Sequence, residues 1–382
     1  MGWRRHLHRN PELGLREEET SSFVYETLES FGGLKLSRPV ETGVVARLFG
    51  GAPGEGRVVA LRADMDALPI REETGLPFAS RNEGVMHACG HDGHTAYLLG
   101  AAKVLAGLRD ELRGEIRFVF QPAEESLGGA EKMVEAGVME GVDVALGTHL
   151  AGRIPVGRVG ISSGPRSASV DTFRILVEGE SGHAARPHEA VDAVAAAAQV
   201  VTALQHVVSR ETDPLDSVVV SVTKINGGTA TNVISPRVEL EGTVRSLSDE
   251  AREGVPAKME RVVDGIARAH GASASFEFYR GPGPVVNDED ATGVVDRVAR
   301  EVFGDEAVVR VPPSMGGEDF SAYRAVVPST TFALVGSANE EKGTAYPNHH
   351  PRFDIDEDAL QVGVRLFVHS ALGLLEPGDA GG

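Results

Sequence analysis

The chain has 382 residues, more than one ordinary hydrophobic core organises, so two domains are expected. With 41% hydrophobic and 24% charged residues it has the composition of a globular protein, and no apolar run is long enough to predict a bilayer span. The net charge of −19 argues against nucleic acid and anionic membrane as partners. A single cysteine cannot form an internal disulfide, and the basic N-terminus lacks the apolar stretch of a secretory signal, so we expect a cytoplasmic protein.

The first part of the chain alternates helix-like and strand-like segments. Helical spacing over 20–31 stops at two glycines, a strongly apolar helix is predicted over 96–112, and strands are predicted at 57–64, 115–120 and 142–149. This alternation predicts an α/β layered domain. Polar side chains just past strand ends in such sheets tend to be functional, and five occupy such positions: Asp64, Asp66, Glu124, Glu125 and His149.

The pattern changes after residue 166. Strands at 171–179, 217–225, 238–247 and 272–280 alternate with helices over about 190–209 and 249–270. The order strand–helix–strand–strand–helix–strand is that of a ferredoxin-like α+β domain. We therefore predict a discontinuous catalytic domain, 1–166 and 282–382, with an inserted lid or dimerisation domain at 167–281.

The stretch "MHACGHDGHT", residues 86–95, contains the only cysteine of the chain, Cys89. Thiolate, imidazole and carboxylate are the side chains that hold metals in cytosolic proteins. A lone buried cysteine is usually a small hydrophobic residue, an exposed histidine is usually solvated, and an acid pair often starts a helix. Here the cysteine is flanked by glycine and histidines in no apolar pattern, which favours a metal site. Other candidates nearby or later in the chain are His87, His91, His94, Glu124, Glu125, His149, His349 and His350.

Several motifs together resemble one family. In chain order they are "RRHLHRNPELGLREEET", "RADMDALPI", "MHACGHDGHT", "FQPAEES", "GTHL", "SGHAARPH", "NVIS", "GTVRS", "GGEDFS" and "NHHPRFDIDED". They resemble the signatures of the metal-dependent amidohydrolases that include hippurate hydrolase, the N-acyl-amino-acid amidohydrolases and the auxin-conjugate hydrolases, which are related to aminoacylase and the dinuclear zinc carboxypeptidases. The resemblance covers nearly the whole chain and implies a zinc-peptidase-like α/β/α catalytic domain carrying the inserted α+β domain.

The resemblance also implies a site for two divalent ions, with Cys89 as the bridging ligand. The implied terminal ligands are His91, Glu125, His149 and His349, the last preferred over His350 because it is the histidine of a His-x-Pro element. His87 and His94 are expected to support the metal site or to pack beside it. Asp66 is expected to orient a ligand, and Asp64 is left out of the ligand set because it stands where carboxypeptidase relatives ligate with histidine. A mixed N, O and S site accepts Zn, Mn, Co or Ni.

Four residues from the rest of the motifs are implied to bind substrate. His183 would donate to the oxyanion, often from a neighbouring subunit, while Asn232 would contact the substrate; Arg245 would hold a carboxylate and Gly317 would let the backbone approach. Without the family context His183 would be a histidine on a surface turn and Arg245 a charge at a strand edge.

The predicted activity is cleavage of an N-acyl or N-aroyl amino acid into a carboxylic acid and a free amino acid, with Glu124 as general base. The expected partners are this small substrate and further copies of the chain, associated through the inserted domain. One alternative is a carboxypeptidase or dipeptidase using the same metals. Another is a non-catalytic metal-binding or regulatory protein on the same fold, which the presence of Glu124 and the full candidate ligand set disfavours.

Overall fold

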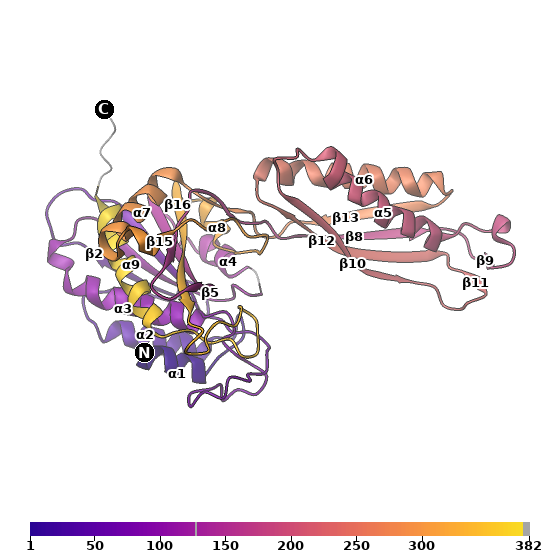
Figure 1. Cartoon of the computed structure of the whole chain (residues 1–382). Helices are drawn as coiled ribbons and strands as arrows, with labels where there is room; N and C mark the ends of the chain where they lie inside the picture. Colours follow the sequence, from indigo (N-terminus) through magenta and orange to yellow (C-terminus); the bar gives the residue numbers. More distant parts are fainter. Residues whose placement is uncertain (127, 377–382) are drawn as a thin grey trace. The chain divides into compact units, whose positions relative to one another are not determined.

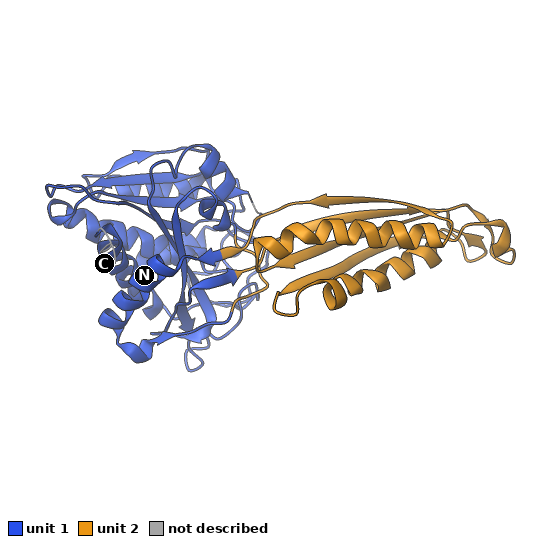
Figure 2. Cartoon of the chain, turned by 90° about the horizontal axis from the view of Figure 1, so that it is seen from above, with its two compact units in different colours: residues 1–166, 286–312, 319–382 blue, residues 167–285, 313–318 orange. Residues whose placement is uncertain are grey.

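The computed structural model describes residues 1–126 and 128–376 and divides the chain into two compact units (Figure 2). Unit 1 comprises Met1–Arg166, Val286–Pro312 and Asp319–Gly382. Unit 2 comprises Ser167–Val285 and a short later segment, Pro313–Glu318. The chain therefore passes from unit 1 into unit 2 and back, and it enters unit 2 once more for the short segment.

In its described residues, unit 1 is built on a mixed eight-stranded sheet in the order β1-β2-β4-β3-β5-β16-β6-β15 (Figure 1). The central strand β3 is parallel to both β4 and β5, and β5 is parallel to β16. The carboxyl ends of these strands therefore lie at one edge of the sheet, where α/β proteins bind ligands. The strands are β1 (Lys35–Ser37), β2 (Val44–Phe49), β3 (Val58–Asp64), β4 (Glu115–Gln121), β5 (Val144–Pro155), β6 (Val159–Gly160), β15 (Val308–Val309) and β16 (Ser329–Ala338), while β7 (Gly164–Ser167) and β14 (Val285–Asn287) pair separately.

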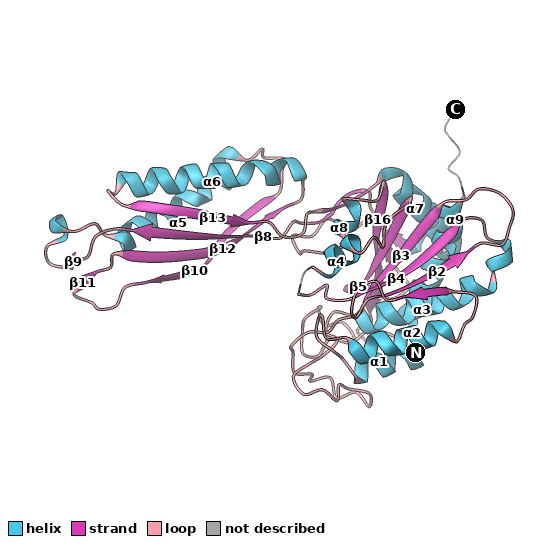
Figure 3. Ribbon diagram, turned by 180° about the vertical axis from the view of Figure 1, so that it is seen from behind, coloured by secondary structure: helices cyan, strands magenta, loops and turns pink. Residues whose placement is uncertain are grey.

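Helices lie on both faces of this sheet (Figure 3). The alternation of β4 shows the reason: Ile116, Phe118 and Phe120 enter the large core cluster, whereas Gln121 on the other face bonds to Tyr323 of α8. Unit 1 contains α1 (Gly2–Arg9), α2 (Glu18–Glu29), α3 (His91–Gly107), η1 (Arg109–Glu111), α4 (Gly129–Glu135), α7 (Glu289–Phe303), η3 (Asp305–Ala307), α8 (Ser321–Arg324) and α9 (Asp358–Leu375).

Among the described helices, α9 alone is long and apolar enough to cross a bilayer, which the sequence analysis did not anticipate. It packs instead against α3, α7 and β16, and buries Leu366, Phe367 and Leu374 in the core of unit 1. A helix that is apolar on most of its surface is expected in this position. The composition of α9 therefore follows from its burial inside the protein.

Unit 2 is an antiparallel sheet with two long helices packed on one face. Among residues 167–285, all of them described, the four strands are ordered β10-β12-β8-β13, and α5 and α6 contact each other and this sheet. Asp192 and Ser248 cap the two helices through their side-chain oxygens. The elements are β8 (Asp171–Glu178), β9 (Gly182–His183), η2 (Pro187–Glu189), α5 (Ala193–Glu211), β10 (Val218–Gly227), β11 (Val233–Ile234), β12 (Arg237–Ser246), α6 (Asp249–Ala269) and β13 (Ser273–Tyr279).

The predicted fold class, an α/β domain with an inserted ferredoxin-like α+β domain, is confirmed, because the strand order in unit 2 is that of a ferredoxin-like sheet. Local details differ from the prediction. The helix expected from residue 96 already begins at His91, and β5 continues past His149 to Pro155, because β16 pairs along its whole length. Helix α1 was not predicted at all.

Candidate metal centre

Four segments of unit 1 bring titratable side chains to the carboxyl edge of the sheet. Asp66 follows β3, Glu124 and Glu125 follow β4, His91 opens α3, and His149 lies within β5. Since β4, β3 and β5 are neighbours in the sheet, the residues that follow them converge. The topology therefore gathers the side chains that the sequence analysis selected from strand ends.

Among the described residues, three overlapping groups of potential ligands form one cluster, which we call the metal cluster. Within each group the ligand atoms lie no more than 4.8 Å apart. The groups share Cys89, His91 and Glu125 between them. They are Cys89–His91–His149, Cys89–Glu125–His349 and His91–Glu124–Glu125. All five predicted metal ligands and the predicted general base thus lie together.

Hydrogen bonds fix which nitrogen each histidine turns to the cluster. His91 Nδ1 lies 3.2 Å from Asp66 Oδ1, and His149 Nδ1 lies 2.8 Å from the carbonyl oxygen of Leu150. Because these oxygens only accept, each Nδ1 carries the proton and donates. The Nε2 atoms then face other members of the cluster: that of His149 lies 3.4 Å from Cys89 Sγ, and that of His91 lies 3.8 Å from Glu125 Oε1. This is the arrangement in which imidazoles ligate metals in proteins.

Asp66 connects two candidate ligands. Its Oδ1 atom accepts from His91, and its Oδ2 atom accepts the backbone N–H of Glu125 at 2.9 Å. The aspartate is buried, so both contacts are sheltered from water. Asp66 therefore orients the His91 ring and the main chain of Glu125 at once.

The late histidine pair separates into two environments. His349 Nε2 lies 3.2 Å from Glu125 Oε1, and its backbone N–H donates to the carbonyl of Ala88 at 2.7 Å. His350 instead stacks on Tyr346, with ring centroids 4.6 Å apart. The left-handed backbone of His349, at φ 68°, turns its side chain to the cluster. His349, and not His350, is the member of the metal cluster.

The donor atoms of the cluster suit a cation. Burial and the nearby Glu125 carboxylate raise the pKa of the Cys89 thiol. Burial opposes ionisation of Glu125, but His349 and His91 outweigh it and lower the pKa of this carboxyl group. Within the described structure, the buried atoms His91 Nε2 and Glu125 Oε1 make no aligned hydrogen bond. A divalent ion would satisfy both atoms and favour the thiolate, so the donor set fits a metal.

A further group, Asp64–His91–His94, has metal-like spacing but different chemistry. His94 Nε2 accepts the backbone N–H of Leu150 at 2.8 Å, so its Nδ1 donates to Asp64 Oδ1 at 2.6 Å. Burial lowers the pKa of His94 to about 3, which keeps the ring neutral. Both nitrogens of His94 are therefore engaged, and the ring holds the main chain beside His149. His87 is also buried, and burial lowers its pKa to about 4.

A buried ionic network on α1, missed by the sequence analysis, borders the cluster. Arg4 Nε and His8 Nδ1 both lie 2.8 Å from Asp92 Oδ2, one residue after His91, and His8 Nε2 lies 3.2 Å from Glu72 Oε1. Burial opposes ionisation of Asp92, but Arg4 and His8 outweigh it and lower its pKa. The only sequence signal was the motif "RRHLH", whose partners lie far along the chain.

The predicted substrate-binding residues lie in unit 2 as two separate pairs. His183 of β9 and Asn232 are neighbours, since Ala184 donates its backbone N–H to the carbonyl of Asn232 at 3.1 Å. Arg245 lies near the end of β12, where a Cβ atom on Gly317 would come within 3.4 Å of Arg245 Nη1. In the described structure, Arg245 forms no ion pair.

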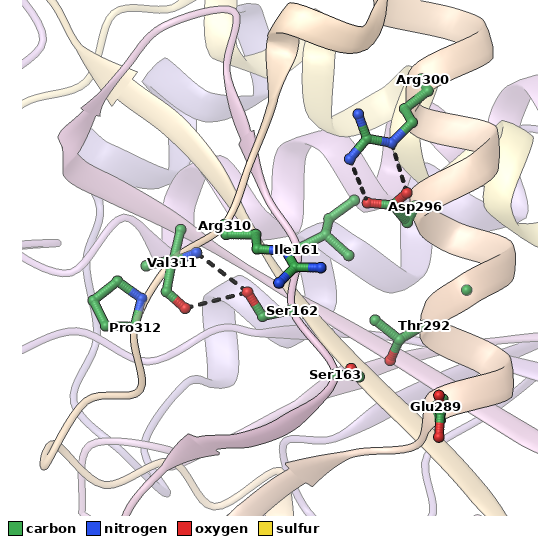
Figure 4. Close-up of a pocket in the computed structure, with 11 residues that line it drawn as sticks. Ile161, Ser162, Ser163, Glu289, Thr292, Asp296, Arg300, Arg310, Val311 and Pro312 are labelled. Carbon is green, nitrogen blue, oxygen red and sulfur yellow. Dashed lines mark hydrogen bonds and ion pairs between the residues drawn. The ribbon is translucent and has the colours of Figure 1, made fainter.

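A cavity of about 610 Å³ lies elsewhere in unit 1, between α7 and the segments around β6 and β15 (Figure 4). Figure 4 shows two pairings in its lining, Arg300 with Asp296 and Ser162 with the backbone of Val311. No member of the metal cluster lines this cavity. The candidate active site is therefore the cluster at the sheet edge.

Comparisons with known proteins identify the family of the chain. The model of "Peptidase family M20/M25/M40" matches residues 60–372. An N-acyl-L-amino acid amidohydrolase from Geobacillus stearothermophilus is 58% identical over 291 residues, which is 76% of this chain and 78% of the relative. Thermostable carboxypeptidase 1 from Saccharolobus solfataricus is 42% identical over 97% of this chain and 93% of its own.

A solved structure from Bacillus subtilis, YXEP, described as a dinuclear metal-binding peptidase from the M20 family, matches with a TM-score of 0.87 and 40% identity over 98% of this chain and 97% of that one. The family resemblance seen in the motifs is thus confirmed over nearly the whole length. The chain belongs to peptidase family M20/M25/M40 and is an amidohydrolase of that family.

Proposed function

We propose that this hydrolase cleaves the amide bond of N-acyl or N-aroyl amino acids, releasing a carboxylic acid and a free amino acid. The observation that carries the proposal is the metal cluster, in which a thiol, three imidazoles and two carboxylates converge at the sheet edge. The 58% identity to an N-acyl-L-amino acid amidohydrolase supports the substrate class.

Two divalent ions would be held by Cys89 as a shared ligand and by His91, Glu125, His149 and His349. Bound there, they would supply a water of lowered pKa and polarise the scissile carbonyl. The donor set mixes nitrogen, oxygen and sulfur, so Zn, Mn, Co and Ni all remain suitable. Metal analysis of the purified protein identifies the native ion.

Glu124 is proposed as the general base. It is buried beside His91 and Glu125, and it is the carboxylate of the pair that is not assigned as a ligand. It takes a proton from the attacking water and later delivers it to the nitrogen of the leaving amine. The oxyanion of the tetrahedral intermediate would receive a hydrogen bond from His183.

Arg245 is proposed to bind the substrate's free α-carboxylate. Burial lowers the pKa of its guanidinium despite the nearby Asp171 carboxylate, so the charged group is partly desolvated, and among the described residues it forms no ion pair. A guanidinium binds a carboxylate through two parallel hydrogen bonds. This contact would restrict the substrates to acids.

We further propose a homo-oligomer formed through unit 2, in the cytoplasm. His183 and Asn232 lie beyond one end of the sheet with β9 and β11, whereas Arg245 lies near the other end of β12 (Figure 1). The eight steps from Arg237 to Arg245 span about 26 Å at the rise of a strand. One small substrate does not reach both pairs in a single copy, so two copies would contribute to each site. Strand β10, at the edge of the sheet with Ile225 exposed, offers a surface for association.

Kinetics on matched substrates test this function. The parent should hydrolyse N-acetyl and N-benzoyl amino acids and act poorly on the corresponding amino-acid amides, which lack the charge. Arg245→Ala should lower kcat/KM for the acids by about 100-fold or more, as expected when one partner of a desolvated charge pair is removed. Equal rates on acids and amides, or equal loss on both in the variant, would show a broader amidase.

A carboxypeptidase is the second candidate, because the 42% identical relative carries that name. Both substrate classes present a carboxylate, so Arg245 does not distinguish them. The two activities are distinguished by a panel of N-acetyl amino acids and unblocked dipeptides with the same C-terminal residue. Faster turnover of the dipeptides would favour the peptidase.

A further inference from the structure

Ala123, directly before the general base, has a backbone conformation unusual for alanine. Its φ is 56°, in the left-handed region, where the Cβ atom crowds the neighbouring carbonyl. Residues in this state persist only when surrounding contacts impose them, and they concentrate at functional sites. We call residues 123–125, which carry Glu124 and Glu125 after β4, the strap.

Two buried carboxylates hold the strap at its ends. Asp66 accepts the N–H of Glu125, as described above. At the other end, Glu17 Oε1 accepts the N–H of Ala123 at 2.8 Å. Glu17 is 0% exposed, and its second oxygen accepts the hydroxyl of Thr42 at 2.8 Å. The carboxylate is thus fixed in place before it contacts the strap.

Close packing leaves the strap little space to relax. A Cβ atom on Gly14 would come within 2.6 Å of Ser126 Oγ and 3.1 Å of Ala123 Cα. A Cβ atom on Gly129 would come within 1.7 Å of the carbonyl oxygen of Pro122. Gly14 and Gly129 therefore let their own segments pack closely against residues 122–126. Within this space, the hydrogen bond from Ala123 to Glu17 sets the backbone conformation of Ala123.

We propose that Glu17 is a positioning residue for the active site: by holding Ala123 in the left-handed conformation, it directs Glu124 and Glu125 into the metal cluster. The inference rests on the proposed roles of these two glutamates. Without the bond, Ala123 gains by returning to a right-handed or extended conformation. That rotation moves the two following side chains away from Cys89 and His91. Glu17 itself touches neither metal nor substrate.

The test compares four full-length variants with the parent. Glu17→Ala removes the bond. Glu17→Gln keeps an oxygen for Ala123 and places an N–H donor beside Thr42. The double variant Glu17→Ala/Ala123→Gly lets the strap adopt the left-handed conformation without a Cβ atom. Glu12→Ala is the matched control, because Glu12 also accepts backbone N–H groups in the same N-terminal segment, but from Glu19 and Thr20 of α2.

The first readout is binding of Co²⁺ alone to metal-free protein, followed by visible absorption, whose band shape reports the coordination geometry. The second is turnover of an N-acetyl amino acid, and thermal unfolding of the metal-free variants measures stability. We expect Glu17→Ala to weaken Co²⁺ binding and kcat by about 10-fold or more each, the scale on which residues that support ligands act. Glu17→Gln should restore most of the Co²⁺ affinity and most of kcat. The double variant should recover each about fivefold relative to Glu17→Ala.

Several results would overturn the inference. They are Co²⁺ affinity and spectrum unchanged in Glu17→Ala, equal losses in Glu12→Ala, or no recovery in the glutamine variant. A loss that disappears at temperatures where Glu17→Ala is fully folded would assign Glu17 to stability alone. If the parent does not hydrolyse N-acyl amino acids but the Co²⁺ pattern holds, the positioning role stands and only the substrate assignment fails.

Discussion

Raising the pH above the pKa of His8 is expected to weaken the attachment of α1 to the turn that carries His91. His8 is fully buried between two carboxylates, Asp92 and Glu72. Burial alone would lower its pKa, and Arg4 adds to that effect. The two carboxylates outweigh both and raise the pKa from 6.5 to about 9. His8 is therefore charged in the folded protein at neutral pH.

The pKa difference converts directly into stability. Because the folded pKa lies above the unfolded one, the contribution is fully present below pH 6.5 and is lost as the pH rises to about 9. At about 1.4 kcal/mol for each pH unit, it amounts to about 3 kcal/mol. A loss of this size is a large part of the stability of a typical domain.

Fluorescence of Trp3, the only tryptophan, provides the assay, since it lies on α1 with its ring 5.8 Å from that of Phe31. Urea unfolding of parent and His8→Gln is followed between pH 6 and pH 10 in the presence of a chelator, so that metal binding adds no pH dependence. The gap in unfolding free energy between the two should shrink by about 3 kcal/mol. His6→Gln, on the exposed face of the same helix, is the control. A gap between parent and His8→Gln that stays constant with pH would refute the charged His8.

The remaining predictions concern the metal cluster. Cys89→Ala should lower metal content and abolish turnover, whereas Cys89→Asp should retain part of both because a carboxylate also ligates divalent ions; metal analysis and kinetics check this, and an active, metal-loaded Cys89→Ala would contradict the bridging role. Glu124→Gln should keep its metals but lose turnover by about 10²–10⁴-fold, since only the base is removed. Glu125→Gln should lose metal affinity as well as turnover, which metal titration measures. If Glu124→Gln lost metal and Glu125→Gln kept it, the two roles would be exchanged.

The parts of the site that the sequence predicted are those that local pattern encodes. Cys89 and His91 lie within one short motif, and Glu124 and Glu125 follow a strand that is recognisable from its apolar run. The rule that parallel strands end at one edge then brings them together. In the same way, the strand and helix order of unit 2 was sufficient to predict its ferredoxin-like sheet.

The parts that escaped prediction depend on contacts between distant segments. Arg4 and Asp92 are 88 residues apart, and no local pattern pairs them. The position of Ala123 was equally hidden, because alanine gives no signal of a left-handed backbone that a glutamate 106 residues earlier imposes. Helix α1 has only eight residues, and its buried face consists of Arg4, Leu7 and His8, so it lacks the apolar stripe from which a helix is predicted.

The single sulfur in the metal cluster also determines how the enzyme reacts with oxidants. Cys89 is the only thiol of the chain, so no second cysteine can resolve a sulfenic acid formed on it. Without metal, burial raises its pKa and keeps the sulfur in the less reactive thiol form. With metals bound, the thiolate's electron pairs would be engaged in coordination. Both the buried thiol and the coordinated thiolate would therefore react slowly with peroxide, so the one sulfur of the site is protected with and without metal.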